Sequence, residues 1–180
     1  MSDGAGSESK QNPMREIRIE KVVVNIGVGE AGEKLNRAEK VIKLITNHQP
    51  TQTLSTTTNR DLGIRVGMPI GVKVTLRRED AVKFLKKAFW VKQNKIMKYS
   101  FDPEGNFSFG ISDYTDFEGM KYDPDIGIFG MDVNVVLYRQ GKRVAHRKKA
   151  KGHIPKSHRV TREESIQFVK DNFNIEVVVP

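Results

Sequence analysis

Residues 70–77 read Ile-Gly-Val-Lys-Val-Thr-Leu-Arg, and this segment decides the fold class. Apolar residues occupy the even positions, and Gly71, Lys73, Thr75 and Arg77 occupy the odd ones. Successive side chains of a strand point to opposite faces, so the segment predicts a half-buried strand whose exposed face is positively charged. Strands that bury only one face are typical of antiparallel sheets.

Neighbouring segments repeat this alternation. Residues 17–26 have strand character, and the apolar residues at 22, 24 and 26 form one face, which places Lys21 and Asn25 on the exposed face. A turn at residues 102–106 leads into apolar residues at period two. Further strands are expected at residues 51–58, 107–111 and 131–138.

Three segments with apolar residues at helical spacing alternate with these strands. They begin after Gly32, at Glu79 and at Thr161, where Thr161 and Glu164 form a capping box. This order of elements predicts an α+β fold with a mainly antiparallel sheet. We expect a disordered polar tail, residues 1–13, followed by a single domain, residues 14–180.

Charge is strongly segregated along the 180 residues, whose net charge is +9. Ten Lys or Arg and no acid lie between Val133 and Arg162, and eleven lie against three acids between Leu54 and Tyr99. Between Phe101 and Asp132 the sign reverses, with eight acids against one Lys. The pattern favours a polyanionic partner on one side and solvent or a basic neighbour on the other. A merely solvated charged surface is the alternative.

Several classes of protein are disfavoured. The chain has no cysteine, no apolar run long enough to span a membrane and no signal-peptide core, which indicates a cytoplasmic protein. The glycines of Gly27-x-Gly29-x-x-Gly32 resemble a dinucleotide-binding turn, but no acid stands near Gln52 to bind the ribose. A tight turn explains these glycines better than a nucleotide-dependent enzyme does.

The sequence gives no reason to expect catalysis, a metal or a cofactor. His146, His153 and His158 lie among Lys and Arg with no carboxylate close in sequence, so phosphate or base contacts suit them better than a metal. Nucleophile motifs such as G-x-S-x-G are missing. We therefore expect neither a catalytic residue nor a small-molecule substrate.

Four strings together carry a family resemblance. They are Lys21–Ala31 (KVVVNIGVGEA), Gln49-Pro50, Gly67–Arg77 (GMPIGVKVTLR) and Tyr122-Asp123 followed by Gly130–Val133 (GMDV). Across residues 14–180 the chain resembles universal ribosomal large-subunit protein five, the 5S-RNA-binding protein of the central protuberance. The basic segment Gly141–Arg162, called the arm below, is similar to the archaeal and eukaryotic branch of that family.

The resemblance implies an antiparallel sheet with helices packed on one face, and an exposed face that binds 5S ribosomal RNA. It assigns Asn25, Gln49 and Thr75 to that contact, and the alternation independently exposes Asn25 and Thr75. The cations and amides of the same face can bind RNA backbone. The expected 5S-binding residues are Lys21, Asn25, Gln49, Lys73, Thr75 and Arg77.

The resemblance also implies that the loop Ser55–Gly67 reaches the peptidyl-site tRNA, and the arm is expected to bind large-subunit RNA. We interpret the loop as polar and cationic, without apolar anchors. Its expected contacts are Thr57, Thr58, Asn59, Arg60 and Arg65. Those of the arm are Lys142, Arg143, His146, Arg147, Lys148, Lys149, Lys151, His153, Lys156, His158 and Arg159. Neighbouring ribosomal proteins are further expected partners, and a non-ribosomal RNA chaperone is the remaining alternative.

Overall fold

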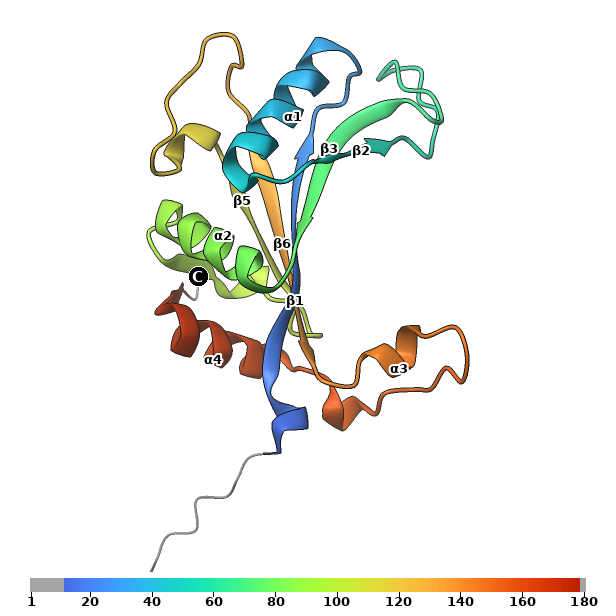
Figure 1. Ribbon diagram of the computed structural model, residues 1–180, viewed down its shortest axis with the longest axis vertical. Coiled ribbons are helices and arrows are strands. Elements are labelled where there is room, and N and C mark those ends of the chain that lie inside the picture. The colour runs from blue at the N-terminus through green and yellow to red at the C-terminus, as the bar shows by residue number, and fades with distance from the viewer. Residues whose placement is uncertain (1–11, 179–180) are drawn as a thin grey trace, which may run out of the picture.

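The computed structural model describes residues 12–178, so residues 1–11 of the expected tail lie outside the described residues. Figure 1 shows the arrangement of its elements. The strands are β1 (Ile17–Gly27), β2 (Thr51–Leu54), β3 (Pro69–Leu76), β4 (Lys95–Met97), β5 (Phe107–Ile111), β6 (Met131–Arg139) and β7 (Glu176–Val178). The α-helices are α1 (Glu33–Thr46), α2 (Arg78–Val91), α3 (Arg143–His146) and α4 (Arg162–Phe173). Short 3₁₀ turns are η1 (Pro13–Arg15), η2 (Lys98–Ser100), η3 (Tyr114–Asp116) and η4 (Lys156–His158).

Five strands form one sheet in the order β2-β3-β1-β6-β5, and each neighbouring pair is antiparallel. Strands β4 and β7 pair in parallel as a separate two-stranded sheet. The predicted α+β fold with a mainly antiparallel sheet is confirmed. None of the helices within residues 12–178 is long and apolar enough to cross a bilayer.

The glycine-rich turn after β1 is not arranged for a nucleotide. Both neighbours of β1 are antiparallel, whereas a dinucleotide-binding turn belongs to a parallel βαβ unit. The amides of Val28 and Gly29 donate to the Ile70 carbonyl at 3.0 and 2.8 Å, so neither N–H is free for phosphate. Gly29 has a φ of 78°, a left-handed conformation that explains glycine in this turn.

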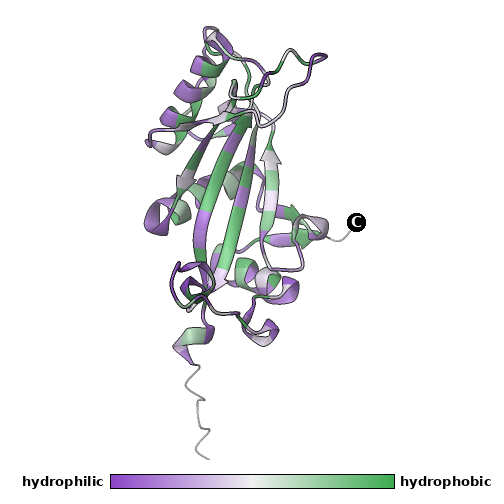
Figure 2. Ribbon diagram, turned by 90° about the vertical axis from the view of Figure 1, so that its right-hand side faces the viewer, coloured by the Kyte–Doolittle hydropathy of each residue, from purple (hydrophilic) through white to green (hydrophobic). Residues whose placement is uncertain are grey.

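Helices α1 and α2 cover one face of the sheet, on the same side of the molecule as α4 (Figure 1). Their apolar stripes match the predicted ones, and burying them against the sheet is the main stabilising term of such a fold. The buried helical residues are Leu35, Ala38, Val41, Ile42 and Ile45 of α1 and Ala81, Phe84, Leu85, Ala88 and Phe89 of α2. The opposite face, which bears Lys73 and Thr75 and is called the open face below, is turned toward the viewer in Figure 2.

Along the central strand β1, the residues that face the core change once from odd-numbered to even-numbered positions. In its first half Ile17 and Ile19 pack against the core, and in its second half residues 22, 24 and 26 are buried. A bulge between Ile19 and Lys21 in the pairing with β6 causes this shift, because the extra residue reverses which side chains face the core. Glu20 and Lys21 are consequently both left on the side of the open face.

The strand predicted at residues 51–58 is shorter than expected. It ends at Leu54, where the Ser55 amide donates to the Met68 carbonyl at 2.8 Å and the chain turns. Beyond it, Asn59 and Ile64 exchange two backbone hydrogen bonds of 2.9 Å. The loop Ser55–Gly67 is therefore a folded hairpin extension, because its own backbone hydrogen bonds hold it.

The capping box of the last helix is confirmed. The Thr161 hydroxyl accepts from the Glu164 amide, and the Glu164 carboxylate accepts from the Thr161 amide at 3.0 Å. Val169 is buried beneath this helix, and Phe173 makes an edge-to-face contact with Phe89. These contacts fasten α4 beside α2, at the end of the sheet from which the arm emerges (Figure 1).

Candidate nucleic-acid interface

The open face presents a row of polar side chains across neighbouring strands. Asn25 of β1 is the cross-strand partner of Lys73, which in turn pairs with Thr51 of β2. Thr75 lies two residues from Lys73 on β3 and pairs with Val23, so Asn25 and Thr75 are diagonal neighbours on this face. Lys73 and Thr75 are exposed, as the alternation predicted, and Asn25 is partly exposed.

Gln49 is exposed in the connection between α1 and β2, two residues before Thr51. It therefore lies at the edge strand next to the row of Asn25 and Lys73. No alternation pattern identified it, since it stands outside every strand. Its assignment came from the family string alone.

The lower part of the open face is more strongly charged. Arg77 is exposed, and its guanidinium donates to the Glu20 carbonyl at 3.5 Å. The Glu20 carboxylate pairs with the Lys142 ammonium at 2.6 Å. Burial opposes ionisation of Glu20, but the hydrogen bond and charge of Lys142, with the charges of Lys21 and Arg77, hold its pKa below the usual value. Glu20 is thus an ionised acid that joins the arm to a basic surface.

The hairpin Ser55–Gly67 exposes every polar residue expected to contact tRNA: Thr57, Thr58, Asn59, Arg60 and Arg65. Two of them also hold the hairpin, because Thr58 Oγ1 accepts from the Val66 amide and Asn59 Oδ1 accepts from the Asp61 amide. The loop is not purely polar, however. Leu62 and Val66 are each 66% exposed, so the hairpin tip offers apolar as well as cationic contacts.

Most cations of the arm are exposed. The arm contains α3 and η4 in an otherwise irregular path, and Gly152 N–H donates to the Val144 carbonyl at 3.1 Å. Its exposed expected contacts are Arg143, His146, Arg147, Lys148, Lys149, Lys151, His153, Lys156 and Arg159. Lys142 and His158 are partly buried, since Lys142 pairs with Glu20 and a His158 ring nitrogen lies 2.8 Å from the Gln140 carbonyl.

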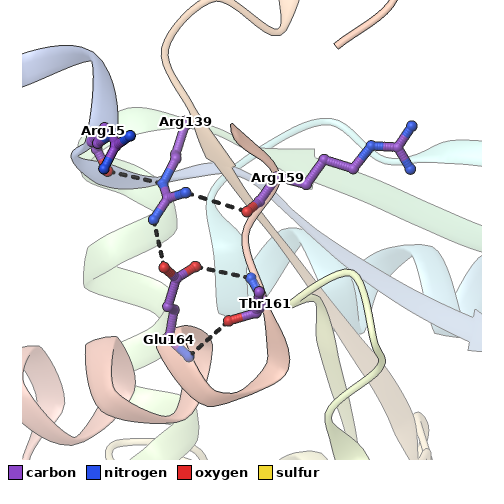
Figure 3. A network of polar contacts seen from close by, with 5 residues as sticks. All are labelled: Arg15, Arg139, Arg159, Thr161 and Glu164. Carbon is purple, nitrogen blue, oxygen red and sulfur yellow. Dashed lines mark hydrogen bonds and ion pairs between the residues drawn. The ribbon is translucent and has the colours of Figure 1, made fainter. Parts of the chain in front are cut away.

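Arg139 holds together the segments where the arm leaves and rejoins the domain (Figure 3). Its guanidinium donates to the Arg15 carbonyl at 3.0 Å, to the Arg159 carbonyl at 3.3 Å and to the Glu164 carboxylate at 2.7 Å. Burial opposes ionisation of Glu164, but the Thr161 amide and Arg139 outweigh it and lower its pKa. One guanidinium therefore joins η1, the end of the arm and α4.

Sequence patterns alone did not single out Arg139 or Glu20. Arg139 stood at the start of a uniformly basic stretch, and Glu20 was a lone acid within the strand whose parity shifts at that residue. Within residues 12–178 no group of three or more His, Asp or Glu could hold a metal ion. His146 and His153 are instead exposed on the arm.

Three basic surfaces therefore lie on the side of the sheet away from α1 and α2. The hairpin extends from one end of the sheet, the arm from the other, and the open face lies between them (Figures 1 and 2). Positive side chains at both ends and hydrogen-bonding groups in the middle suit a large polyanion, because phosphates are bound by charge and bases by donors and acceptors.

Comparison with known proteins identifies the family. Residues 12–65 match the model of ribosomal protein L5, and residues 69–168 match the model of the C-terminus of the same ribosomal family. The chain is similar to large ribosomal subunit protein uL5 of Picrophilus torridus, 58% identical over 172 residues that cover 95% of this chain and 98% of that protein. It is 59% identical to uL5 of Thermoplasma volcanium over 168 residues, covering 93% and 99% of the two chains.

A more distant archaeal relative shows the same extent of similarity. Large ribosomal subunit protein uL5 of Methanococcus maripaludis is 48% identical over 172 residues, covering 94% of this chain and 95% of that one. The arm and the open face both fall within the matched region. The chain therefore belongs to the ribosomal protein L5 family and is a structural, non-enzymatic component of the large ribosomal subunit.

Proposed function

We propose that this protein holds 5S ribosomal RNA in the central protuberance of the cytoplasmic ribosome through its open face. The observation that carries the proposal is the juxtaposition of Asn25, Lys73 and Thr75 on two paired strands. These side chains are exposed or partly exposed and stand on the rigid centre of the sheet, so binding costs little ordering.

Recognition divides between charge and hydrogen bonding. Lys73 and Arg77 contact phosphates, while Asn25 and Thr75 bond base edges and 2′-hydroxyls of an irregular RNA loop. Gln49 adds an amide at the neighbouring edge strand. A helix-free sheet face suits such a loop, because splayed bases can approach a flat surface of donors and acceptors.

The arm and the hairpin extend the contact in two directions. The arm, with its exposed run Arg147, Lys148, Lys149 and Lys151, bridges the 5S RNA to large-subunit RNA. The hairpin Ser55–Gly67 contacts the peptidyl-site tRNA. Neighbouring proteins of the central protuberance cover part of the remaining surface.

Filter binding with 5S RNA tests the proposal. Asn25→Ala and Thr75→Val should each weaken binding by about 1–3 kcal/mol, because a polar group of the RNA loses its partner inside the interface. Both variants should fold, since neither side chain faces the core. Gln167→Ala, which removes an exposed amide from α4, serves as the matched control.

Unchanged 5S affinity in both variants would overturn the assignment of the open face. Competition with unrelated single-stranded RNA separates the proposal from a general RNA chaperone. The chaperone would lose 5S RNA to the competitor at comparable concentrations, whereas a specific binder would retain it.

A further inference from the structure

A groove of about 540 Å³ lies at the β5 edge of the open face, beside the β1–β3 surface assigned to 5S RNA. Strands β5 and β6 form its floor, and the segment between the end of α2 and η2 forms its wall. Ser108, Asp132 and Asn134 belong to the floor, and Lys92, Lys95 and Tyr99 belong to the wall.

The floor continues the polar rows of the open face. Asp132 is the cross-strand partner of Asn25, and Asn134 is the partner of Val23. On its other side Asp132 pairs with Gly110, which places no side chain over the carboxylate. A Cβ built on Gly110 would lie 3.7 Å from Asp132 Oδ1, so glycine keeps this part of the groove open.

The floor is chemically suited to a base and unsuited to a phosphate. Asp132, Asn134 and Ser108 line the groove and are exposed, so their polar atoms are accessible to a ligand. An ionised carboxylate repels phosphate and accepts hydrogen bonds only, so it selects N–H donors. Guanine alone carries two adjacent donors, N1–H and N2–H, on its Watson–Crick edge, and these match the two carboxylate oxygens of Asp132.

The wall supplies the two contacts that a nucleotide needs in addition. The Tyr99 side chain is 71% exposed, an unusual position for an aromatic ring unless a partner stacks on it. Lys92 and Lys95 are cations beside the groove, placed for the phosphates that flank a base. Lys95 also lies 3.9 Å from Glu176, but both side chains are largely exposed and this weak pair yields to a phosphate.

We propose that this groove binds one unpaired guanine nucleotide of ribosomal RNA. The guanine edge pairs with Asp132, its ring stacks on Tyr99 and its flanking phosphates contact Lys92 and Lys95. Because the site lies on β5 and β6, it does not depend on the 5S assignment of β1 and β3. The site also gives a role to Asp132, the exposed aspartate of the string Gly130–Val133.

Chemical probing with kethoxal tests the proposal, since this reagent attacks N1 and N2 of unpaired guanines. The full protein is assembled on large-subunit RNA together with 5S RNA, and guanine reactivities are compared with those of the free RNA. We expect one protected guanine whose reactivity returns to the free level with Asp132→Asn, while protections elsewhere persist. Tyr99→Ala should expose the same guanine and weaken binding roughly tenfold through the lost stacking.

Gly110→Val provides a second variant that is independent of charge. A branched residue suits a strand and meets no close neighbour at Cβ, so the fold should hold while the groove fills. Ser112→Val, just beyond β5 and outside the groove, is the matched control and should leave the guanine protected.

The outcomes separate the alternatives. Identical guanine reactivity with wild type, Asp132→Asn and Gly110→Val would overturn the site, including the case in which a protein neighbour covers the groove. Loss of protection only with Lys92→Ala or Lys95→Ala would overturn base recognition and leave a nonspecific phosphate contact. Failure of Asn25→Ala to affect 5S binding would bear on the proposed function but not on this groove.

Discussion

The Lys142 ammonium lies 2.6 Å from the Glu20 carboxylate and joins the start of the arm to the bulge of the central strand. Both side chains are partly buried, and 122 residues of chain separate them. The pair therefore ties the start of the arm to β1. Arg139 holds the other end of the arm, because it donates to the Arg159 carbonyl and to the Glu164 carboxylate.

Glu20→Gln should lower the free energy of unfolding by about 1 kcal/mol at neutral pH, because Lys142 loses a partner close to the surface. The folded pKa of Glu20 is depressed, so its stabilisation is complete above the ordinary glutamate pKa of about 4.3 and is lost as the pH falls through the folded pKa. Urea denaturation at pH 7 and pH 3 should therefore show a smaller deficit of the mutant at pH 3 than at pH 7. Glu16→Gln, which removes an exposed pair with Arg18, should change stability little at either pH.

Arg60→Ala with Arg65→Ala should reduce cross-linking to peptidyl-site tRNA and leave 5S affinity near wild type. The hairpin extends beyond the end of β2 and β3, and Arg60 and Arg65 hold it only through their carbonyls, which alanine keeps. Lys83→Ala with Lys87→Ala removes the same charge from exposed positions on α2, which covers the other face of the sheet. A double mutant that loses 5S RNA but keeps the tRNA cross-link would show that the two assignments are reversed.

Four cations of the arm, Arg147, Lys148, Lys149 and Lys151, can be neutralised together. The slope of log affinity against log salt concentration should then become less steep by roughly 3 if all four contact phosphate. Each phosphate contact releases condensed counterions, so its loss appears in the slope measured on large-subunit RNA with 5S RNA. Stability should change by less than about 0.5 kcal/mol, since all four side chains are exposed. Removing four exposed lysines of α1 and α2, namely Lys34, Lys43, Lys83 and Lys87, controls for net charge.

We also predict that the arm becomes ordered only on RNA. Its contacts distinguish the two ends of the arm from the run between them. Its junctions are held by Arg139 and by the pair of Glu20 with Lys142. The run between them buries little apolar surface and repels itself. Amide hydrogen exchange of the free protein should be fast at residues 148–151 and slower at the junctions, and slow exchange throughout would contradict the prediction.

Gly71→Ala should destabilise the sheet by roughly 1–3 kcal/mol through overpacking. A Cβ on Gly71 would lie 2.8 Å from Thr53 Oγ1 and 2.9 Å from the Ile26 carbonyl oxygen. A Cβ built on Gly27, the cross-strand partner of Gly71, would have no atom within 4 Å. Gly27→Ala is therefore the control, at the same level of the sheet. Equal thermal unfolding of the two variants would show that the strands can separate to admit the methyl group.

The sequence by itself determined the fold class and half of the open face. Alternation in Ile70–Arg77 placed Lys73 and Thr75 on the exposed side, because a strand's period of two depends on local geometry alone. The capping box at Thr161 and the apolar stripes of α1 and α2 were readable for the same reason, since each is formed by residues close together in the chain. Family strings added Gln49, for which no periodicity exists.

Only the tertiary structure decided which distant segments meet. The bulge at Glu20 depends on pairing with β6, and its partner Lys142 is brought near by the path of the whole chain. Arg139 forms hydrogen bonds with η1, with the end of the arm and with α4. Asp132, Gly110 and Tyr99 line the same groove. Such contacts depend on strand order and register, and these are set by the packing of the complete core, which no local pattern contains.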